Sequence, residues 1–352
     1  MTNQQMIESI RTLSTGRSLD PDLETDISNF LSRHGCDYLL TKIKNDSHRQ
    51  HQALERAMNG IAIKERYKAC TPLFSQSDIP YAVIKGAVLS QTMYQDPLIR
   101  ASGDIDILIR RRDADHLKQL LTENGFVQGR ITDAGIVPFS RRELLFQTAL
   151  SHQTAPYVKA TNNKLCPYIN VDINMDILWG ESDVKADMDL VLSYTESSSL
   201  FNISFQKLTP EMEFISLCLH HYKDLNSLYL LSNGSFKLGL FCEIYDYLRN
   251  VKPDATLISK FCERTNVGQY LYVCIHQTRQ IFDDPLLNPY LKSLESDKNG
   301  SLLDSLGLNE RERKSWGIDL FDRLLHPNLA DYVQDKLSDE EKEKVKLNRL
   351  LM

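Results

Sequence analysis

The sequence predicts an α+β fold, with a small group of strands between two helical regions. Residues 1–75 carry apolar side chains at helical spacing, and residues 181–352 do so again over most of their length. Between them, residues 76–180 contain short apolar or alternating runs bounded by turn residues, which are typical of strands. We therefore expect three parts: an N-terminal helical region, a central domain that holds the sheet, and a C-terminal helical domain.

The composition is that of a globular protein: 42% of the residues are hydrophobic, which is enough to form buried cores. The net charge of -6 argues against a large nucleic-acid-binding surface, which usually needs a basic face. No run approaches the ~20 consecutive apolar residues that cross a bilayer, so we expect no membrane partner. The seven cysteines are scattered without a C-x-x-C pair. This favours buried thiols in a reducing, cytoplasmic setting.

Two helical patterns are clear in the N-terminal region. Asp20 followed by Pro21 marks the start of one helix. A longer pattern runs from Leu54 to Cys70, with apolar residues on one side and charged residues on the other. We expect these helices to pack on the domain that follows.

Three segments of the central domain are predicted to be strands. Residues 81–84 form a short apolar run, which ends at Lys85-Gly86 before a helical pattern. Residues 104–109 alternate polar and apolar and then become fully apolar, and residues 166–178 alternate throughout. In the last segment the acidic and amide side chains all lie on one face.

Acidic side chains on two of these strands favour a metal site. Asp104 and Asp106 are two residues apart, so in a strand they point to one face, with Cα atoms about 6.6 Å apart. Carboxylates in this arrangement bind hard divalent cations such as Mg²⁺ or Mn²⁺. Asp172 offers a third carboxylate from another strand. The alternative interpretation is a solvated strand face, because a D-x-D spacing alone is common on such faces. The residues around the pair therefore decide between the two interpretations.

The Lys85-Gly86 turn supplies that context. Gly86 allows the backbone to approach a phosphate closely, and the N–H groups at the start of the following helix face an anion. Lys85 adds a positive charge suited to phosphate. The alternative interpretation is a plain strand-to-helix turn with a surface lysine.

The two strands and the segment between them contain four motifs: Ile84-Lys-Gly-Ala-Val-Leu89, Tyr94-x-Asp96-Pro97, Arg100 and Asp104-Ile-Asp-Ile-Leu-Ile109. In these motifs the sequence resembles the uncharacterised nucleotidyltransferase family of the polymerase-β-like superfamily, and the resemblance covers roughly residues 60 to 250. Further similarity is seen in His220-His-Tyr-Lys223 and in Lys237-Leu-x-x-Phe241-x-Glu243-Ile244.

This resemblance implies a small mixed β-sheet core flanked by helices, with the C-terminal helical domain closing over the nucleotide. It implies that Asp104 and Asp106 hold Mg²⁺ or Mn²⁺, and that Asp172 either joins them or takes the proton of the acceptor. The residues expected to bind the nucleotide are Lys85, Gly86, Arg100, Lys223 and Lys237.

Of the departures from the family's pattern, which include Glu243 where an Asp is more usual and a longer gap from Gly86 to Asp104, two lie at the expected site. The turn reads Gly86-Ala87 where Gly-Ser or Gly-Gly is usual, which removes a hydroxyl donor to phosphate. The third strand reads Asp172-Ile-Asn174 in place of Asp-x-His. This leaves Asp176, on the same face, as an alternative third carboxylate.

The predicted function is transfer of a nucleotidyl or phosphoryl group from a nucleoside triphosphate such as ATP to a hydroxyl of a peptide or small-molecule acceptor. The acceptor class follows from the resemblance, because such family members often occur with peptide-modification systems. Two alternatives are a non-catalytic nucleotide-binding or interaction module and an antitoxin-like partner of a helical toxin. The long helical flanks favour a self-contained enzyme over the antitoxin.

Overall fold

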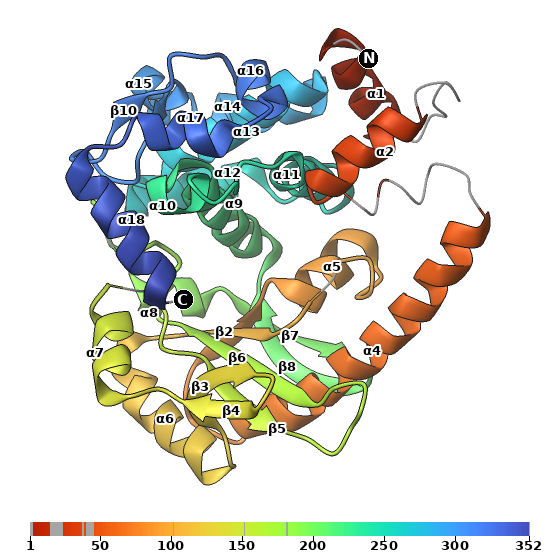
Figure 1. The fold of residues 1–352 in the computed structure, drawn as a ribbon, viewed down its shortest axis with the longest axis vertical. Helices are drawn as coiled ribbons and strands as arrows, with labels where there is room; N and C mark the ends of the chain where they lie inside the picture. The colour runs from red at the N-terminus through yellow and green to blue at the C-terminus, as the bar shows by residue number, and fades with distance from the viewer. Residues whose placement is uncertain are drawn as a thin grey trace. The chain divides into compact units, whose positions relative to one another are not determined.

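The computed structural model describes residues 3–14, 24–36, 39, 46–100, 102–150, 152–180 and 182–351 (Figure 1). The helix start predicted at Asp20 and Pro21 lies outside these residues. The chain divides into two compact units. The first, here called the sheet unit, comprises residues 47–181 and 185–216; the second, the helical unit, comprises residues 1–46, 182–184 and 217–352. The domain boundaries expected near residues 75 and 180 stay predictions.

The sheet unit is built on a mixed sheet, which confirms the predicted α+β fold. Its strands are β1 (Tyr81–Ile84), β2 (Ile105–Ile109), β3 (Val127–Thr132), β4 (Gly135–Pro138), β5 (Tyr157–Ala160), β6 (Tyr168–Asn174), β7 (Thr195–Leu200) and β8 (Ile203–Leu208). In the described residues they form one eight-stranded sheet of order β4-β3-β5-β6-β2-β1-β8-β7. The β2–β6 and β1–β8 pairs are parallel, and β1 runs antiparallel to β2.

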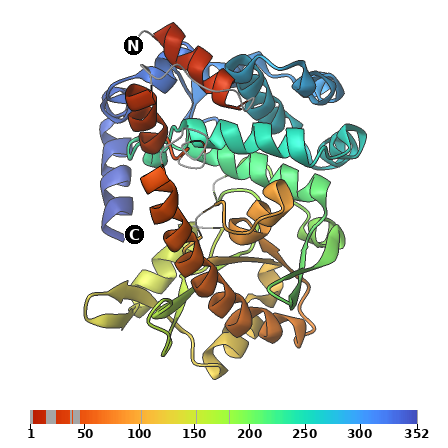
Figure 2. The same ribbon diagram turned by 90° about the vertical axis from the view of Figure 1, so that its right-hand side faces the viewer.

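Three helices of the sheet unit bury the apolar face of this sheet: α4 (Asp46–Ser75), α5 (Gly86–Tyr94) and α6 (Ala114–Glu123). The unit also contains α7 (Arg141–Leu150), α8 (Met188–Ser193) and a short 3-10 turn at Arg111–Asp113. Side chains of α4, α5 and α6 form one hydrophobic core with Val83, Ile107 and Ile173 of the central strands. Figure 2 shows α4 as a long orange helix.

The strand register decides which side chains lie on the other face. Val83 pairs with Ile107, and both belong to the core under the helices. The next pair along these strands is Ile84 with Asp106, and because successive side chains alternate between faces, Asp106 points away from that core. On β6, Asp172 is the register partner of Asp106 and therefore shares its face.

The helical unit confirms the predicted helical C-terminal region. Its helices are α1 (Asn3–Ser14), α2 (Glu24–Arg33), α9 (Pro210–Asn226, which begins in the sheet unit), α10 (Leu228–Leu231), α11 (Leu238–Asn250), α12 (Ala255–Thr265), α13 (Gly268–Phe282), α14 (Asn288–Ser293), α15 (Gly300–Leu303), α16 (Leu320–Leu325), α17 (Leu329–Asp335) and α18 (Asp339–Leu351). A small hairpin adds β9 (Ser305–Leu306) and β10 (Lys314–Ser315). Helix α13 packs against α1, α11, α12 and α14. None of the described helices combines the length and the apolar character needed to span a bilayer.

Candidate active site

Asp106 lies on β2 in the middle of the sheet, with 8% of its surface exposed. Its Oδ1 accepts hydrogen bonds from Lys85 Nζ at 3.0 Å and from Asn174 Nδ2 at 3.1 Å. The ammonium of Lys85 therefore supplies the positive charge nearest to this carboxylate. Within the described residues, no hydrogen bond involves Asp106 Oδ2.

Two more carboxylates lie beside Asp106, and we call the three residues Asp104, Asp106 and Asp172 the acidic cluster. Asp172 sits opposite Asp106 on the neighbouring parallel strand, at a strand separation of about 4.8 Å. Asp104 directly precedes β2, so the strand begins one residue later than predicted.

The pKa values of the cluster reflect burial and like charge. Burial, followed by the charges of Asp106 and Asp104, raises the pKa of Asp172 to about 7. Burial and then Asp106 raise the pKa of Asp104 above its usual range, and Lys85 and Arg66 oppose this shift. The cluster is thus a set of acidic groups that repel one another, and the positive charges of Lys85 and Arg66 compensate this repulsion in part.

The donor chemistry of the acidic cluster fits Mg²⁺ or Mn²⁺, since these ions take carboxylate oxygens as ligands. A divalent cation would relieve the repulsion that raises the pKa values of Asp104 and Asp172. Among the residues that the structure describes, however, no three such groups converge on a common ion position. The three side chains are of the right chemical type for a divalent cation and lie close together. In this structure, Lys85 binds the Oδ1 oxygen of Asp106.

The Lys85-Gly86 turn joins β1 to α5 through an unusual backbone conformation. Lys85 has φ 58° and ψ -157°, and Gly86 has φ 47°. For a lysine this conformation costs on the order of 1–3 kcal/mol, and such strain is concentrated at functional sites. A Cβ on Gly86 would lie 2.7 Å from Ser102 Oγ, so the missing side chain makes room for Ser102. The predicted role of the Gly86 backbone in phosphate binding stays a prediction.

The other residues predicted to bind nucleotide lie elsewhere. Arg100 is in the loop between α5 and β2, where its backbone N–H donates to Ser90 Oγ at 3.1 Å. Lys223 is near the end of α9, with Nζ 3.7 Å from Asp224 Oδ1, and Lys237 is the N-cap residue of α11. Both lysines belong to the helical unit. Nucleotide binding by Arg100 and these lysines stays a prediction.

Asp176 is placed apart from the acidic cluster. The expectation of a strand through residue 178 is wrong, because β6 ends at Asn174. Asp176 Oδ1 accepts the N–H of Leu178 at 2.9 Å, so its carboxylate closes a turn. Burial raises the pKa of Asp176, and Arg111 and Lys185 are the charged groups that oppose this. The structure therefore brings Asp172, and not Asp176, beside the other two carboxylates.

Three residues near the cluster were not predicted as site residues. Asn174 donates to Asp106, and Gln153 Nε2 donates to Asn174 Oδ1 at 2.7 Å. Arg66 of α4 donates from Nη1 to the carbonyl of Ser102 at 2.6 Å and lowers the pKa of Asp104. The alternation of residues 166–178 did place Asn174 on the face of Asp172, but nothing in the sequence indicates Gln153 or Arg66.

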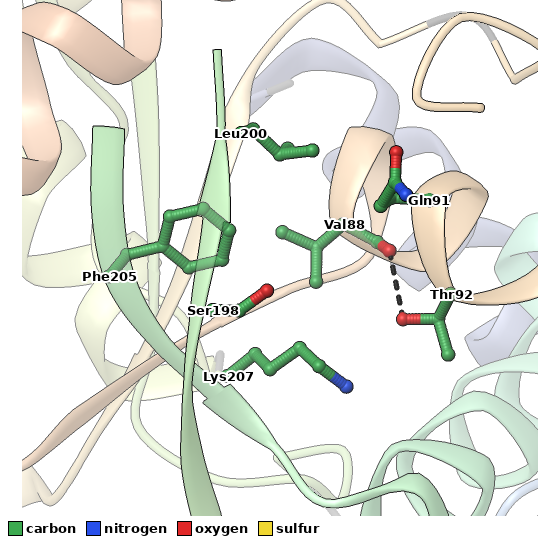
Figure 3. A pocket seen from close by; sticks show the side chains of 7 residues that line it. All are labelled: Val88, Gln91, Thr92, Ser198, Leu200, Phe205 and Lys207. Atoms are coloured by element: carbon green, nitrogen blue, oxygen red, sulfur yellow. Dashed lines mark hydrogen bonds between the residues drawn. The ribbon is translucent and has the colours of Figure 1, made fainter. Parts of the chain in front are cut away.

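A cavity of about 160 Å³ lies between α5 and the β7–β8 hairpin (Figure 3). Its walls include the apolar side chains of Val88, Leu200 and Phe205 and the polar side chains of Gln91, Ser198 and Lys207. Lys207 is the register partner of Val83, so its side chain lies on the face of the sheet opposite to Asp106. The sheet therefore separates this cavity from the acidic cluster.

Comparison with known families decides what kind of protein this is. A family described as "Uncharacterised nucleotidyltransferase" matches residues 31–283, more than half of the chain. The chain belongs to the uncharacterised nucleotidyltransferase family. The matched residues include the acidic cluster, the Lys85-Gly86 turn and both predicted lysines of the helical unit. Membership supports nucleotidyl transfer as the general reaction and a nucleotide as a substrate. No curated protein and no solved structure matches the chain.

Proposed function

We propose that this protein is a metal-dependent enzyme that transfers a nucleotidyl, or alternatively a phosphoryl, group from a nucleoside triphosphate to a hydroxyl of a peptide or small-molecule acceptor. One observation carries the proposal. Three mutually repelling carboxylates, Asp104, Asp106 and Asp172, lie beside a lysine at a strained strand-to-helix turn, in a chain of the nucleotidyltransferase family.

The acidic cluster would hold Mg²⁺ or Mn²⁺, which when bound would neutralise negative charge on the triphosphate and the departing pyrophosphate. Its carboxylates are suited to this because they are partly buried, close together and only partly compensated by the charges of Lys85 and Arg66. Lys85 would add a positive charge for the phosphates, and the N–H groups at the start of α5 would donate to them.

In nucleotidyl transfer, the acceptor oxygen would form a bond to the α-phosphorus. The bond between that phosphorus and the bridging oxygen of pyrophosphate would break, and pyrophosphate would leave with the electron pair. The hydroxyl proton would pass to Asp172. A bound cation would relieve the repulsion within the acidic cluster and so favour the ionised form of Asp172, which is the form that accepts a proton.

Labelled nucleotides test the proposal directly. The full chain is incubated with Mg²⁺ or Mn²⁺ and with each nucleoside triphosphate, labelled at the α- or the γ-phosphorus, together with candidate hydroxyl acceptors. Transfer of the α-label means nucleotidyl transfer, and transfer of the γ-label means phosphoryl transfer. We expect Asp104→Ala and Asp106→Ala to abolish transfer, while Asp176→Asn, outside the acidic cluster, retains it. Transfer that persists in Asp104→Ala and Asp106→Ala contradicts the proposal.

A non-catalytic nucleotide-binding module is the second candidate, and one observation favours it. Asp106 is already paired with Lys85, and the described residues contain no three acidic, His or Cys groups gathered at one ion position. This candidate predicts that the protein binds a nucleoside triphosphate and leaves it intact, with or without a divalent cation.

A further inference from the structure

A short relay of amide side chains ends on Asp106. Gln153 Nε2 donates to Asn174 Oδ1 at 2.7 Å, and Asn174 Nδ2 donates to Asp106 Oδ1 at 3.1 Å. Asn174 is 2% exposed, so water has little access to this hydrogen bond. A β-bridge joins the backbones of Gln153 and Asn174, and Met175 N–H donates to the carbonyl of His152 at 2.8 Å. The backbone therefore fixes the positions from which both amide side chains extend.

Gln153 determines which end of the Asn174 amide meets Asp106. An asparagine side chain can present either its oxygen or its NH₂ group, and an ionised carboxylate only accepts hydrogen bonds. Because the Gln153 NH₂ group binds the Asn174 oxygen, the Asn174 NH₂ group is the end that faces Asp106. The reverse orientation would set oxygen against oxygen at one contact and NH₂ against NH₂ at the other.

Both donors to Asp106 bind the same oxygen. Lys85 approaches from the end of β1 and Asn174 from the end of β6, and both bind Oδ1. No hydrogen bond among the described residues involves Oδ2. A rotation of the carboxylate about its Cβ–Cγ bond would break two charge-assisted hydrogen bonds, so the relay defines which oxygen stays available.

We infer that Asn174 and Gln153 are positioning residues, which hold Asp106 through Oδ1 so that Oδ2 is presented to the divalent cation. The inference rests on the proposed function, since it assumes that Asp106 is a metal ligand. Neither amide would touch the ion or the substrate. Outer groups that orient a metal ligand typically change metal affinity or activity by 10–100-fold when they are removed.

The test is Mn²⁺ binding by the full chain without nucleotide, measured from the free Mn²⁺ signal in electron paramagnetic resonance. We expect Asn174→Leu, which keeps the volume and loses the donor, to raise the dissociation constant for Mn²⁺ about 10–100-fold. Gln153→Leu should weaken binding less, and it should have no further effect in the Asn174→Leu background, because there is then no amide to orient. Gln119→Leu is the control, because Gln119 is an exposed amide of α6, the helix that packs on the opposite face of the sheet, and this variant should bind Mn²⁺ like the wild type.

The outcomes separate this inference from the proposed function. If the wild type binds no Mn²⁺, or Asp106→Asn binds it equally well, the proposed function fails and the inference with it. If the wild type binds Mn²⁺ and Asp106→Asn does not, unchanged affinity in Asn174→Leu overturns the inference alone. Should Asn174→Leu not fold, as judged by circular dichroism, Gln153→Leu decides: weaker binding supports the relay, and unchanged binding overturns it.

Discussion

Asp106 and Asp172 lie opposite each other on the parallel strands β2 and β6, and both carboxylates lie on the face of the sheet away from the α4–α6 core. The register of the sheet fixes the Cα positions of both residues on neighbouring strands. Burial, followed by the charges of Asp106 and Asp104, raises the pKa of Asp172 to about 7. This relationship leads to several measurable consequences.

The first concerns stability and pH in the metal-free protein. The pKa of Asp172 is about 7 in the folded state and about 3.9 in the unfolded chain, so the folded state binds the proton more tightly. The contribution of Asp172 to the free energy of unfolding is therefore fully present below about pH 4, and it is lost as the pH rises through 7. We expect Asp172→Asn to be more stable than the wild type at pH 8, by on the order of 3 kcal/mol, with a much smaller difference at pH 4.5. Urea unfolding in EDTA at both values measures this, and a less stable variant at pH 8 contradicts it.

The second concerns stabilisation by metal. A cation that binds only the folded state raises the free energy of unfolding by about 2.7 kcal/mol at a hundred times its dissociation constant. We expect Mg²⁺ at pH 8 to raise the unfolding temperature of the wild type and of Asp176→Asn, and to leave Asp106→Asn unchanged. Scanning fluorimetry with a Mg²⁺ titration measures these shifts. An equal shift in Asp106→Asn would place the ion elsewhere.

The third concerns the turn itself. Gly86→Ala would put a Cβ 2.7 Å from Ser102 Oγ on a residue with φ 47°. We expect a loss of stability of about 1–3 kcal/mol in urea unfolding. In the Ser102→Ala background the loss should be smaller, because the clash with Oγ is gone and only the positive φ remains. An equal loss in both backgrounds would mean that Ser102 is not the obstacle.

The fourth concerns Lys85. Its ammonium forms an ion pair with Asp106, and we expect it to bind the phosphates of the nucleoside triphosphate during transfer. Lys85→Met should lower kcat/KM for the nucleoside triphosphate by about 10²-fold or more, the usual effect of removing one group that stabilises developing charge. The exposed Lys118 of α6 provides the control Lys118→Met, which should leave kcat/KM unchanged. Equal values of kcat/KM in the two variants would show that Lys85 does not act in the reaction.

The sequence predicted the parts of the fold that depend on local periodicity. The strand at residues 81–84 is found as predicted, and the period of two in residues 104–109 indicated that Asp104 and Asp106 go together. The mixed sheet came from the family resemblance. The residues of the acidic cluster could therefore be predicted from the sequence.

Features that depend on contacts between distant segments could not be predicted from the sequence. The helical pattern of residues 54–70 was treated as one apolar side, yet Leu54 is 61% exposed and Ile63 is buried. These residues are nine positions apart, which at about 100° per residue puts them on opposite sides of α4. Likewise, Gln153 reaches Asn174 only through a β-bridge, which no local pattern can indicate.

Pyrophosphate release tests the central claim most directly. The protein is mixed with a γ-labelled nucleoside triphosphate, a hydroxyl acceptor and Mg²⁺, and release of labelled pyrophosphate is followed in the wild type and in Asp106→Asn, with EDTA as a second control. We predict release by the wild type that EDTA stops, and a rate in Asp106→Asn that is lower by about 10³-fold or more. Bound but intact nucleotide in the wild type, or equal rates in both proteins, would contradict the assignment of the acidic cluster as a catalytic metal site.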